Sequence, residues 1–355
     1  MKHNKLCAAA LALAGLALVV LVGCSLPSLP GASDAPAAAL DPLTGQAAIW
    51  TDQCPAAVTV QSDAGANLRG IGDASLVLEA LTEGETSSSL CLVWPSVEAV
   101  PEVGPVAAGQ DLYWQLLAAQ QVLPVQRGAG VYAGNLLDEY GVRTVDALEV
   151  GVSAFYYEGA WGQPDALSWY TSGSRLSGVL AGLEIDPQTQ SEALDTEPAP
   201  LPALLPFGEV SEPGTEGVAG IEVQFSETAA TGFTYDAEAG VYRMADAGGA
   251  PRIDANTGEQ AAFDNVLVLY SAPTLRDDGH TWGYDLTMGG GYYLSGGQAW
   301  NILWTQGVDT TLSIYNSGGK AISIQPGRSY IALLGSLPGQ QLILTDASGA
   351  KLSTP

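Results

Sequence analysis

The sequence predicts an α+β protein: an N-terminal α/β domain, in which helices cover a mixed sheet, followed by a C-terminal domain that is mostly antiparallel β. Three observations indicate this fold class. The chain has 355 residues, which is too long for one ordinary core. Strand-like and helix-like segments alternate in its first half. Its second half repeats short segments of alternating polarity, separated by turns that contain Gly, Asp or Asn.

The predicted N-terminal elements begin with a strand–helix–strand unit, which favours parallel pairing of its two strands. Asp73 is a typical N-cap for the helix of this unit, and Gly84 a typical end. In order, the elements are a strand at 55–60, a helix at 74–84, a strand at 89–94, a helix at 111–121, a strand at 152–157 and a loop leading into a helix within 164–183.

The second half has the period-two pattern of antiparallel strands. Residues 277–280 and the glycines at 289–291 are predicted hairpin bends. The predicted strands are 221–225, 240–244, 265–270, 282–287, 291–295, 300–304, 311–315, 321–324, 330–334 and 341–345.

The chain begins with the pattern of a bacterial lipoprotein signal peptide. Two lysines precede an apolar stretch that ends at residues 21–24, Leu-Val-Gly-Cys, which resembles a lipobox. This pattern predicts removal of residues 1–23 and lipidation of the Cys24 thiol, which would hold the chain on the outer face of the cytoplasmic membrane. The alternative is an ordinary secretory peptide with an incidental cysteine.

Two segments of biased composition divide the remainder, the first rich in Pro, Ala, Ser and Gly and the second rich in Pro and acidic residues. Residues 24–50 have the composition of a flexible tether, and residues 186–216 that of a linker between domains. The N-terminal domain is therefore predicted at 51–185 and the C-terminal domain at 217–355. Some apolar linker residues could pack on a domain surface, namely Leu204, Leu205 and Phe207.

Two cysteines remain in the exported part of the chain, Cys54 and Cys91. An even pair outside the cytosol predicts one structural disulfide, provided that the two segments lie side by side in one sheet. The alternative is two buried thiols, which behave as small apolar groups.

The charge balance is strongly acidic, with 38 Asp and Glu against 12 Lys and Arg and a net charge of −26. Such a surface repels phosphate backbones and anionic headgroups, so no nucleic acid partner is expected.

Few residues are suited to catalysis. His280 is the one histidine beyond the leader, and it lies in a predicted turn with no nucleophile elbow to serve. A lone histidine cannot build a zinc site. We therefore predict no catalytic residue, metal or cofactor. Three tryptophans could form a stacking platform for carbohydrate, although core packing is the default: Trp114, Trp161 and Trp169.

Residues 251–270 place several acidic and amide side chains before an apolar run. The spacing begins like a calcium loop at Asp254 and Asn256, but then fails where a turn is expected. We predict instead that Asp254 and Asn265 are structural residues that frame the strand at 265–270.

Several runs resemble the YerB-like lipoproteins of Gram-positive bacteria. They are FTYDAEAGVYRMADAGGAPRIDANTGEQAAFDNVLVLY, GGGYYLSGGQAWNILWT and GKAISIQPGRSYIALL, with a looser likeness in DASLVLEALTEG, Gly104-Pro105 and WYTSGSRL. The likeness covers residues 54–335. It implies a surface lipoprotein with two domains of mixed α and β structure and no established biochemical role.

The resemblance also selects candidate ligand residues. This chain lacks the arginines that the family carries after its Gly-Pro and Glu-Gly pairs, but it keeps other matching side chains. We expect any ligand site near the residues Glu79, Glu83, Tyr170, Thr171 and Ser172. Glu79 and Glu83 are four residues apart and would share one face of the predicted helix.

These inferences predict a lipid-anchored, extracytoplasmic, non-enzymatic binding or scaffolding module. Its partners would be the membrane, through the lipid, and envelope proteins or the cell wall. A cell-wall hydrolase that uses acidic residues is the alternative, and so is a solute-binding lipoprotein.

Overall fold

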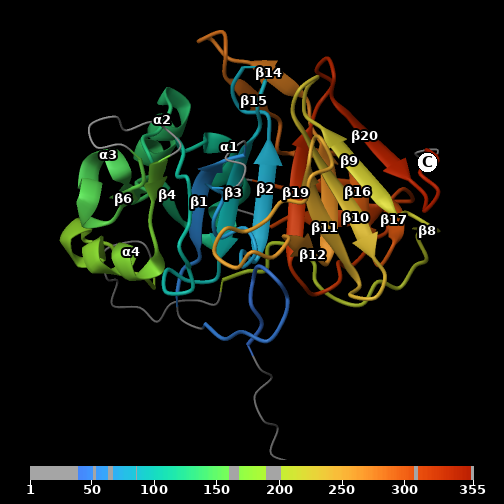
Figure 1. Cartoon of the computed structure of the whole chain (residues 1–355), viewed down its shortest axis with the longest axis horizontal. Coiled ribbons are helices and arrows are strands. Elements are labelled where there is room, and N and C mark those ends of the chain that lie inside the picture. The colour runs from blue at the N-terminus through green and yellow to red at the C-terminus, as the bar shows by residue number, and fades with distance from the viewer. Residues whose placement is uncertain are drawn as a thin grey trace, which may run out of the picture. The chain divides into compact units, whose positions relative to one another are not determined.

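One main sheet runs through both halves of the sequence (Figure 1). The computed structural model describes residues 39–50, 53–62, 67–84, 86–159, 168–188, 201–307 and 311–352. In this part of the chain the main sheet has 11 strands, with β8 (Thr215–Glu216) paired to β17. The other ten follow the order β18 (Ser313–Asn316), β17 (Gln298–Thr305), β16 (Met288–Ser295), β13 (Asn265–Tyr270), β19 (Ser329–Leu334), β2 (Leu76–Ala80), β3 (Ser89–Trp94), β1 (Ala56–Gln61), β4 (Leu123–Gln126) and β5 (Val145–Asp146).

The remaining strands form smaller sheets. Five of them pair in the order β12 (Ala262–Phe263), β11 (Val241–Asp246), β10 (Ala230–Asp236), β9 (Gly220–Gln224) and β20 (Gln341–Thr345). Two hairpin-like ribbons are β14 (Pro273–Leu275) with β15 (Trp282–Tyr284), and β6 (Tyr156–Tyr157) with β7 (Trp169–Tyr170). The helices are α1 (Asp111–Leu116), α2 (Val131–Tyr140), α3 (Ala147–Val150) and α4 (Gly173–Leu180).

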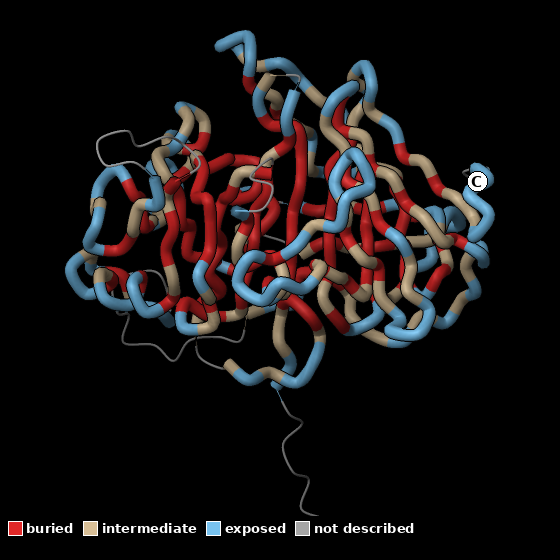
Figure 2. Tube along the Cα trace, viewed as in Figure 1, coloured by how far each residue is buried: buried red, intermediate tan, exposed pale blue. Residues whose placement is uncertain are grey.

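The central strands are buried on both faces, as Figure 2 shows by their red colour. In β2, Val77 belongs to one apolar core, whereas Leu76 and Leu78 belong to the other. The five-stranded sheet and α4 contribute to the first core, and α1 and α2 contribute to the second. The predicted α+β fold class is thus confirmed.

The helix predicted at 74–84 is wrong, because these residues contain the strand β2. β2 pairs with β3 on one side and with β19 on the other. A strand that is buried on both faces is apolar at nearly every position, so its sequence does not alternate. The parallel pairing expected for the strands at 55–60 and 89–94 is also wrong, since β1 and β3 are antiparallel neighbours.

Part of the predicted tether packs against the fold. Leu43 is fully buried, and the Thr44 carbonyl accepts a hydrogen bond of 2.8 Å from the Gly327 amide. From the predicted linker, Leu204 and Leu205 enter the second core. Residues 1–23 and Cys24 lie outside the described residues. Among those described, no helix is both long and apolar enough to cross a bilayer.

The second half is mainly antiparallel, as predicted, with two exceptions at its centre. β13 pairs in parallel with β19, and β19 pairs in parallel with β2, which joins the halves in one sheet. Contact between the halves is close enough that residues 38–355 form one compact unit. The glycines at 289–291 lie inside β16 rather than in the predicted bend.

The β14–β15 hairpin contacts the end of β2 (Figure 1). Tyr284 donates a hydrogen bond of 2.8 Å to the Leu81 carbonyl, and Trp282 Nε1 donates one of 2.8 Å to the Gly84 carbonyl. Arg276 forms an ion pair of 2.5 Å with Asp111 at the start of α1. This hairpin therefore connects the second half of the chain to the first through hydrogen bonds and an ion pair.

Candidate functional site

The predicted disulfide is absent, because Cys54 and Cys91 are both free, buried thiols. Their segments do pair, as expected, but Cys91 faces Thr59 in the register of β1 and β3. Cys54 precedes Thr59 by five positions, roughly 16 Å along an extended strand, whereas a disulfide needs α-carbons within about 7 Å. Burial, with a smaller contribution from Asp186, raises the pKa of the Cys54 thiol to about 12.

Glu79 lies in the interior and not on an exposed helix face. Its side chain is 1% exposed, and its carboxylate accepts hydrogen bonds of 2.9 Å from Thr231 and 2.6 Å from Tyr330. Ser88 donates a third bond of 2.5 Å. These partners come from β10, β19 and the segment before β3, so Glu79 links both sheets.

Glu83 is exposed and lies beyond the end of β2. Its carboxylate accepts a hydrogen bond of 3.3 Å from Gln110, and its backbone bridges to Thr281 beside the β14–β15 hairpin. No described contact joins Glu83 to the buried cluster around Glu79. The two glutamates therefore do not form one site.

Tyr170, Thr171 and Ser172 connect β7 to α4. Thr171 is fully buried, and its hydroxyl donates a 2.7 Å bond to the Ala154 carbonyl. Ser172 is the N-cap residue of α4. Only Tyr170 of this segment joins a larger cluster of polar and aromatic side chains, in which its hydroxyl donates a 3.2 Å bond to the Asn67 carbonyl.

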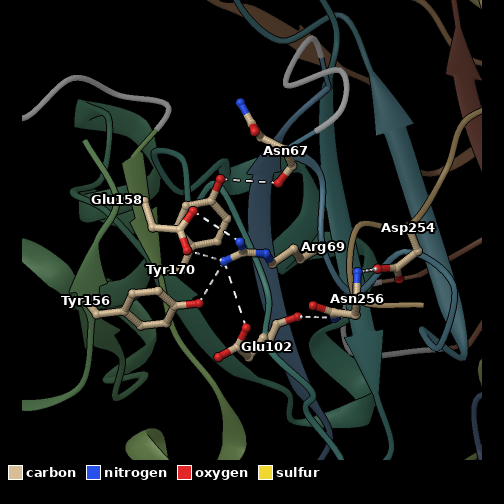
Figure 3. Close-up of polar contacts among 8 residues, drawn as sticks. All are labelled: Asn67, Arg69, Glu102, Tyr156, Glu158, Tyr170, Asp254 and Asn256. Atoms are coloured by element: carbon tan, nitrogen blue, oxygen red, sulfur yellow. Dashed lines mark hydrogen bonds and ion pairs between the residues drawn. The ribbon is translucent and has the colours of Figure 1, made fainter. Parts of the chain in front are cut away.

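That cluster is centred on Arg69 (Figure 3). The Arg69 guanidinium lies 4.4 Å from the centre of the Tyr170 ring and donates a 2.9 Å bond to the Tyr156 hydroxyl. It also donates two bonds, of 2.8 and 3.1 Å, to the Glu158 carboxylate. Such a fork-to-carboxylate pair fixes the guanidinium plane as well as its charge.

The two tyrosine rings of the cluster are stacked, with centroids 5.6 Å apart. Arg175 lies 4.9 Å from the centre of the Tyr156 ring. The side chain of Arg69 is only 20% exposed, whereas that of Glu158 is 47% exposed. Burial raises the pKa of Tyr156 to about 12, against the opposing charge of Arg69. We call Arg69, Tyr156, Glu158, Tyr170 and Arg175 the arginine–tyrosine cluster.

A second set of contacts connects this region to the C-terminal half (Figure 3). Glu102 lies 3.9 Å from Arg69, and its carbonyl accepts a 2.8 Å bond from Asn256. The Asp254 carboxylate, fully buried, accepts bonds of 2.7 Å from the Gly72 amide and 2.8 Å from the Asn256 amide. Asp254 therefore holds a turn against the N-terminal half.

Asn265, the other predicted structural residue, is also fully buried. Its amide donates a 2.8 Å bond to the Gln325 carbonyl, and its side-chain oxygen accepts a 2.9 Å bond from Tyr293. These bonds connect the start of β13 to β16 and to the segment before β19.

The opposite face of the β6–β7 ribbon carries different side chains. Tyr156 and Tyr170 are cross-strand partners on one face, so Tyr157 and Trp169 lie on the other. Arg127, which follows β4, lies 5.9 Å from the centre of the Trp169 ring. Trp114 is buried in the second core, and Trp161 lies outside the described residues.

The described residues offer little for metal or nucleophilic chemistry. They contain no group of three or more His, Cys, Asp and Glu side chains that could hold a metal ion. His280 is exposed in the β14–β15 turn, where its ring nitrogen lies 3.2 Å from the Asp278 carbonyl oxygen. The arginine–tyrosine cluster is instead suited to holding a ligand by charge and stacking.

The sequence patterns miss most of this cluster. Arg69 and Glu158 are separated by 89 positions and come together only because a loop before β2 reaches the β6–β7 ribbon. One signal was available: basic residues are so scarce in this chain that each one outside the leader is a candidate for a specific partner.

Two protein-family models define the class to which this α+β fold belongs. The model described as protein of unknown function (DUF3048) N-terminal domain matches residues 43–186, and the DUF3048 C-terminal domain model matches residues 221–331. Together they span most of the chain, which therefore belongs to the DUF3048 family.

The structure is similar to the crystal structure of the YerB protein from Bacillus subtilis, with a TM-score of 0.71 and 21% sequence identity. The match covers 86% of this chain and 99% of that chain. At this identity the likeness shows a shared fold. The expected kinship with YerB-like proteins is confirmed. No curated protein matches the chain.

Proposed function

We propose that this protein is a lipid-anchored, extracytoplasmic binding module of the cell envelope, without enzymatic activity. The lipobox-like residues 21–24 support the anchor and the location. The arginine–tyrosine cluster supports the binding role, and it is the observation on which the proposal mainly depends.

The cluster has the chemistry of a recognition surface. Arg175 is exposed and stacks on Tyr156, yet none of the ion pairs among the described residues includes it. In a chain with 38 acidic residues, an arginine that has no carboxylate partner among the described residues has charge available for a ligand. Arg69 and Glu158 hold the rings in place, which reduces the entropy lost on binding.

The hydrolase alternative receives less support. Its two carboxylates would have to act together, but Glu79 is enclosed by three hydroxyl donors while Glu83 lies at the surface. Turnover of purified peptidoglycan that is lost in Glu79→Gln would favour the hydrolase and contradict our proposal.

Crosslinking and pull-down from intact cells tests the proposal. We expect the wild-type protein to retrieve a defined envelope component, and Arg175→Glu to reduce its recovery at least about ten-fold, because a rim charge is reversed. Arg143→Glu is the matched control, since Arg143 is also an exposed arginine of the N-terminal half, 3.9 Å from Glu184.

Cys24→Ala is the control for the anchor, and it should release the protein from the membrane fraction. Equal recovery with Arg175→Glu and with wild type would show that the cluster is not the binding surface. Membrane retention of Cys24→Ala would remove the lipid anchor from the proposal.

A further inference from the structure

Arg127 and Trp169 meet on the face of the β6–β7 ribbon that is opposite the arginine–tyrosine cluster. The Arg127 guanidinium carbon lies 5.9 Å from the centre of the Trp169 ring. Arg127 Nε and Trp169 Nε1 are both buried atoms, and neither has a hydrogen-bond partner in the part of the chain that the structure describes. Two neighbouring side chains thus each have an unsatisfied donor, although buried polar groups normally have partners.

The two groups without partners, Arg127 Nε–H and Trp169 Nε1–H, are both hydrogen-bond donors, and the first belongs to a cation. An indole Nε1–H cannot accept a hydrogen bond, nor can a guanidinium. Although the chain has 38 acidic residues, no ion pair within the described ranges includes Arg127. The Glu158 carboxylate belongs to the arginine–tyrosine cluster, where Arg69 holds it. Among the described residues, neither donor therefore has an acceptor with negative charge.

The backbone around the two side chains is firmly held. The Arg127 amide donates a 2.8 Å bond to the Ala107 carbonyl, and the Val106 amide donates a 2.7 Å bond to the Trp169 carbonyl. Residues 106 and 107 are therefore hydrogen-bonded to both positions and fix their spacing. A further 2.9 Å bond from the Gly109 amide to the Gly128 carbonyl continues this pairing. Donors on a fixed backbone need little reorganisation to bind.

We propose that Arg127 and Trp169 form a binding site for an anionic group, a carboxylate or a phosphate, carried by the envelope ligand of this protein. The guanidinium supplies charge and a donor fork, and the indole supplies one further N–H donor. This inference rests on the proposed binding function and adds the chemical class of the ligand. The chain is strongly acidic, so the site would select an anion by local contacts and not by long-range attraction.

Titration of the purified mature protein in detergent with inorganic phosphate, and separately with acetate, tests this site. The readout is the ¹⁵N–¹H resonance of the Trp169 indole, assigned by its loss in Trp169→Phe, at constant ionic strength. We expect a saturable shift in the millimolar range for at least one anion. The anion with the lower Kd identifies the group as phosphate or carboxylate.

Arg127→Gln should raise that Kd at least about ten-fold, because it removes the charge and the fork. Arg143→Gln is the matched control and should leave the Kd unchanged, and unaltered resonances of the other indoles show that each variant is folded. Non-saturating shifts with both anions, or equal Kd values for Arg127→Gln and wild type, would overturn the proposal. An equal increase of the Kd in Arg143→Gln would also overturn the proposal, since it would indicate a non-specific effect of net charge.

The two proposals fail separately. If Arg175→Glu loses capture of the envelope component while the wild-type protein binds no anion, only the proposed anion site is contradicted. Saturable anion binding without capture of an envelope component would leave the anion site standing and would sink the proposed function.

Discussion

Glu79 is a buried acidic side chain held by hydroxyl groups and not by a cation. No ion pair among the described residues includes it, and its three donors are Ser88, Thr231 and Tyr330. Burial, and after it the charge of Glu79, raises the pKa of Tyr330 well above its ordinary value. A buried polar cluster of this kind depends on every member being satisfied.

Removal of the Glu79 side chain should therefore destabilise the fold. We expect Glu79→Ala to lower the free energy of unfolding by about 3 kcal/mol, because it leaves three buried hydroxyls without their acceptor. Glu79→Gln should cost less, since it keeps one acceptor oxygen. Glu83→Ala, at the exposed site, should change stability by less than about 0.5 kcal/mol. Urea unfolding of the three variants checks this, and similar losses for Glu79→Ala and Glu83→Ala would contradict it.

Residue-scale expectations succeeded where a side chain acts on its own neighbourhood. Asp254 precedes a turn, and its carboxylate accepts the Asn256 amide two positions later. That contact follows from local geometry. The burial and contacts of Glu79 do not follow from local geometry, because its partners Thr231 and Tyr330 are 152 and 251 positions away.

At the scale of elements, the glycines of β16 show why a local pattern can mislead. A β-carbon on Gly289 would lie 2.0 Å from the Tyr270 carbonyl oxygen, and one on Gly291 would lie 2.4 Å from that of Val268. A β-carbon on Gly290 would lie 3.9 Å from its nearest neighbour, the Ile302 carbonyl oxygen. The run therefore reflects the close approach of β13 to β16 at two positions, which glycine alone allows.

We predict that Gly289→Ala and Gly291→Ala each destabilise the protein by about 2 kcal/mol or more, because the new methyl group would collide with the backbone of β13. Gly290→Ala should be neutral, or stabilising by up to about 0.5 kcal/mol, since it restricts the unfolded chain without a clash. Thermal unfolding of the three variants measures the difference. A destabilisation by Gly290→Ala as large as that by Gly291→Ala would show that the β16 backbone is not arranged as described.

The errors at this scale have one cause. Strand β2 reads as a helix because Asp73 and Gly84 flank an apolar run that tertiary burial makes continuous. Strands with one half-buried face, such as β9 and β11, keep an alternating pattern that the sequence predicts. The sequence does not predict which strands pair with them, because register depends on turns and contacts elsewhere in the chain.

At the scale of the whole molecule, the free energy of unfolding should depend on pH in the acidic range. Thr281 Oγ1 donates to the Asp278 carboxylate and, with nearby amides, lowers the pKa of Asp278 to about 2. Turn amides and hydroxyls also lower the pKa of Asp285 and Asp346, and turn amides together with Arg243 lower that of Asp236. A folded-state pKa below the unfolded value of 3.8 means that the charged form favours folding.

The stability from these carboxylates should be fully present above about pH 4 and should fall as the pH drops toward about 2. We expect the urea midpoint of unfolding to decrease through this window. Asp278→Asn should flatten the dependence, because it removes the carboxylate with the largest described decrease in pKa. A midpoint that is constant down to about pH 2, or the same slope in Asp278→Asn, would refute this assignment.

The amino-acid sequence by itself determined the fold class, the kinship with YerB-like proteins and most strands of the second half. These depend on composition, short motifs and local alternation, which are properties of neighbouring residues. The lipid anchor remains a prediction from the same kind of local evidence.

Only the tertiary structure decided that β2 is a strand paired with β19, that Cys54 and Cys91 stay apart, and that Arg69 meets Glu158. Each of these depends on segments that are distant in the chain. Their pairing is set by the burial of two apolar cores on the faces of one sheet, a global free-energy balance that no short window of sequence contains.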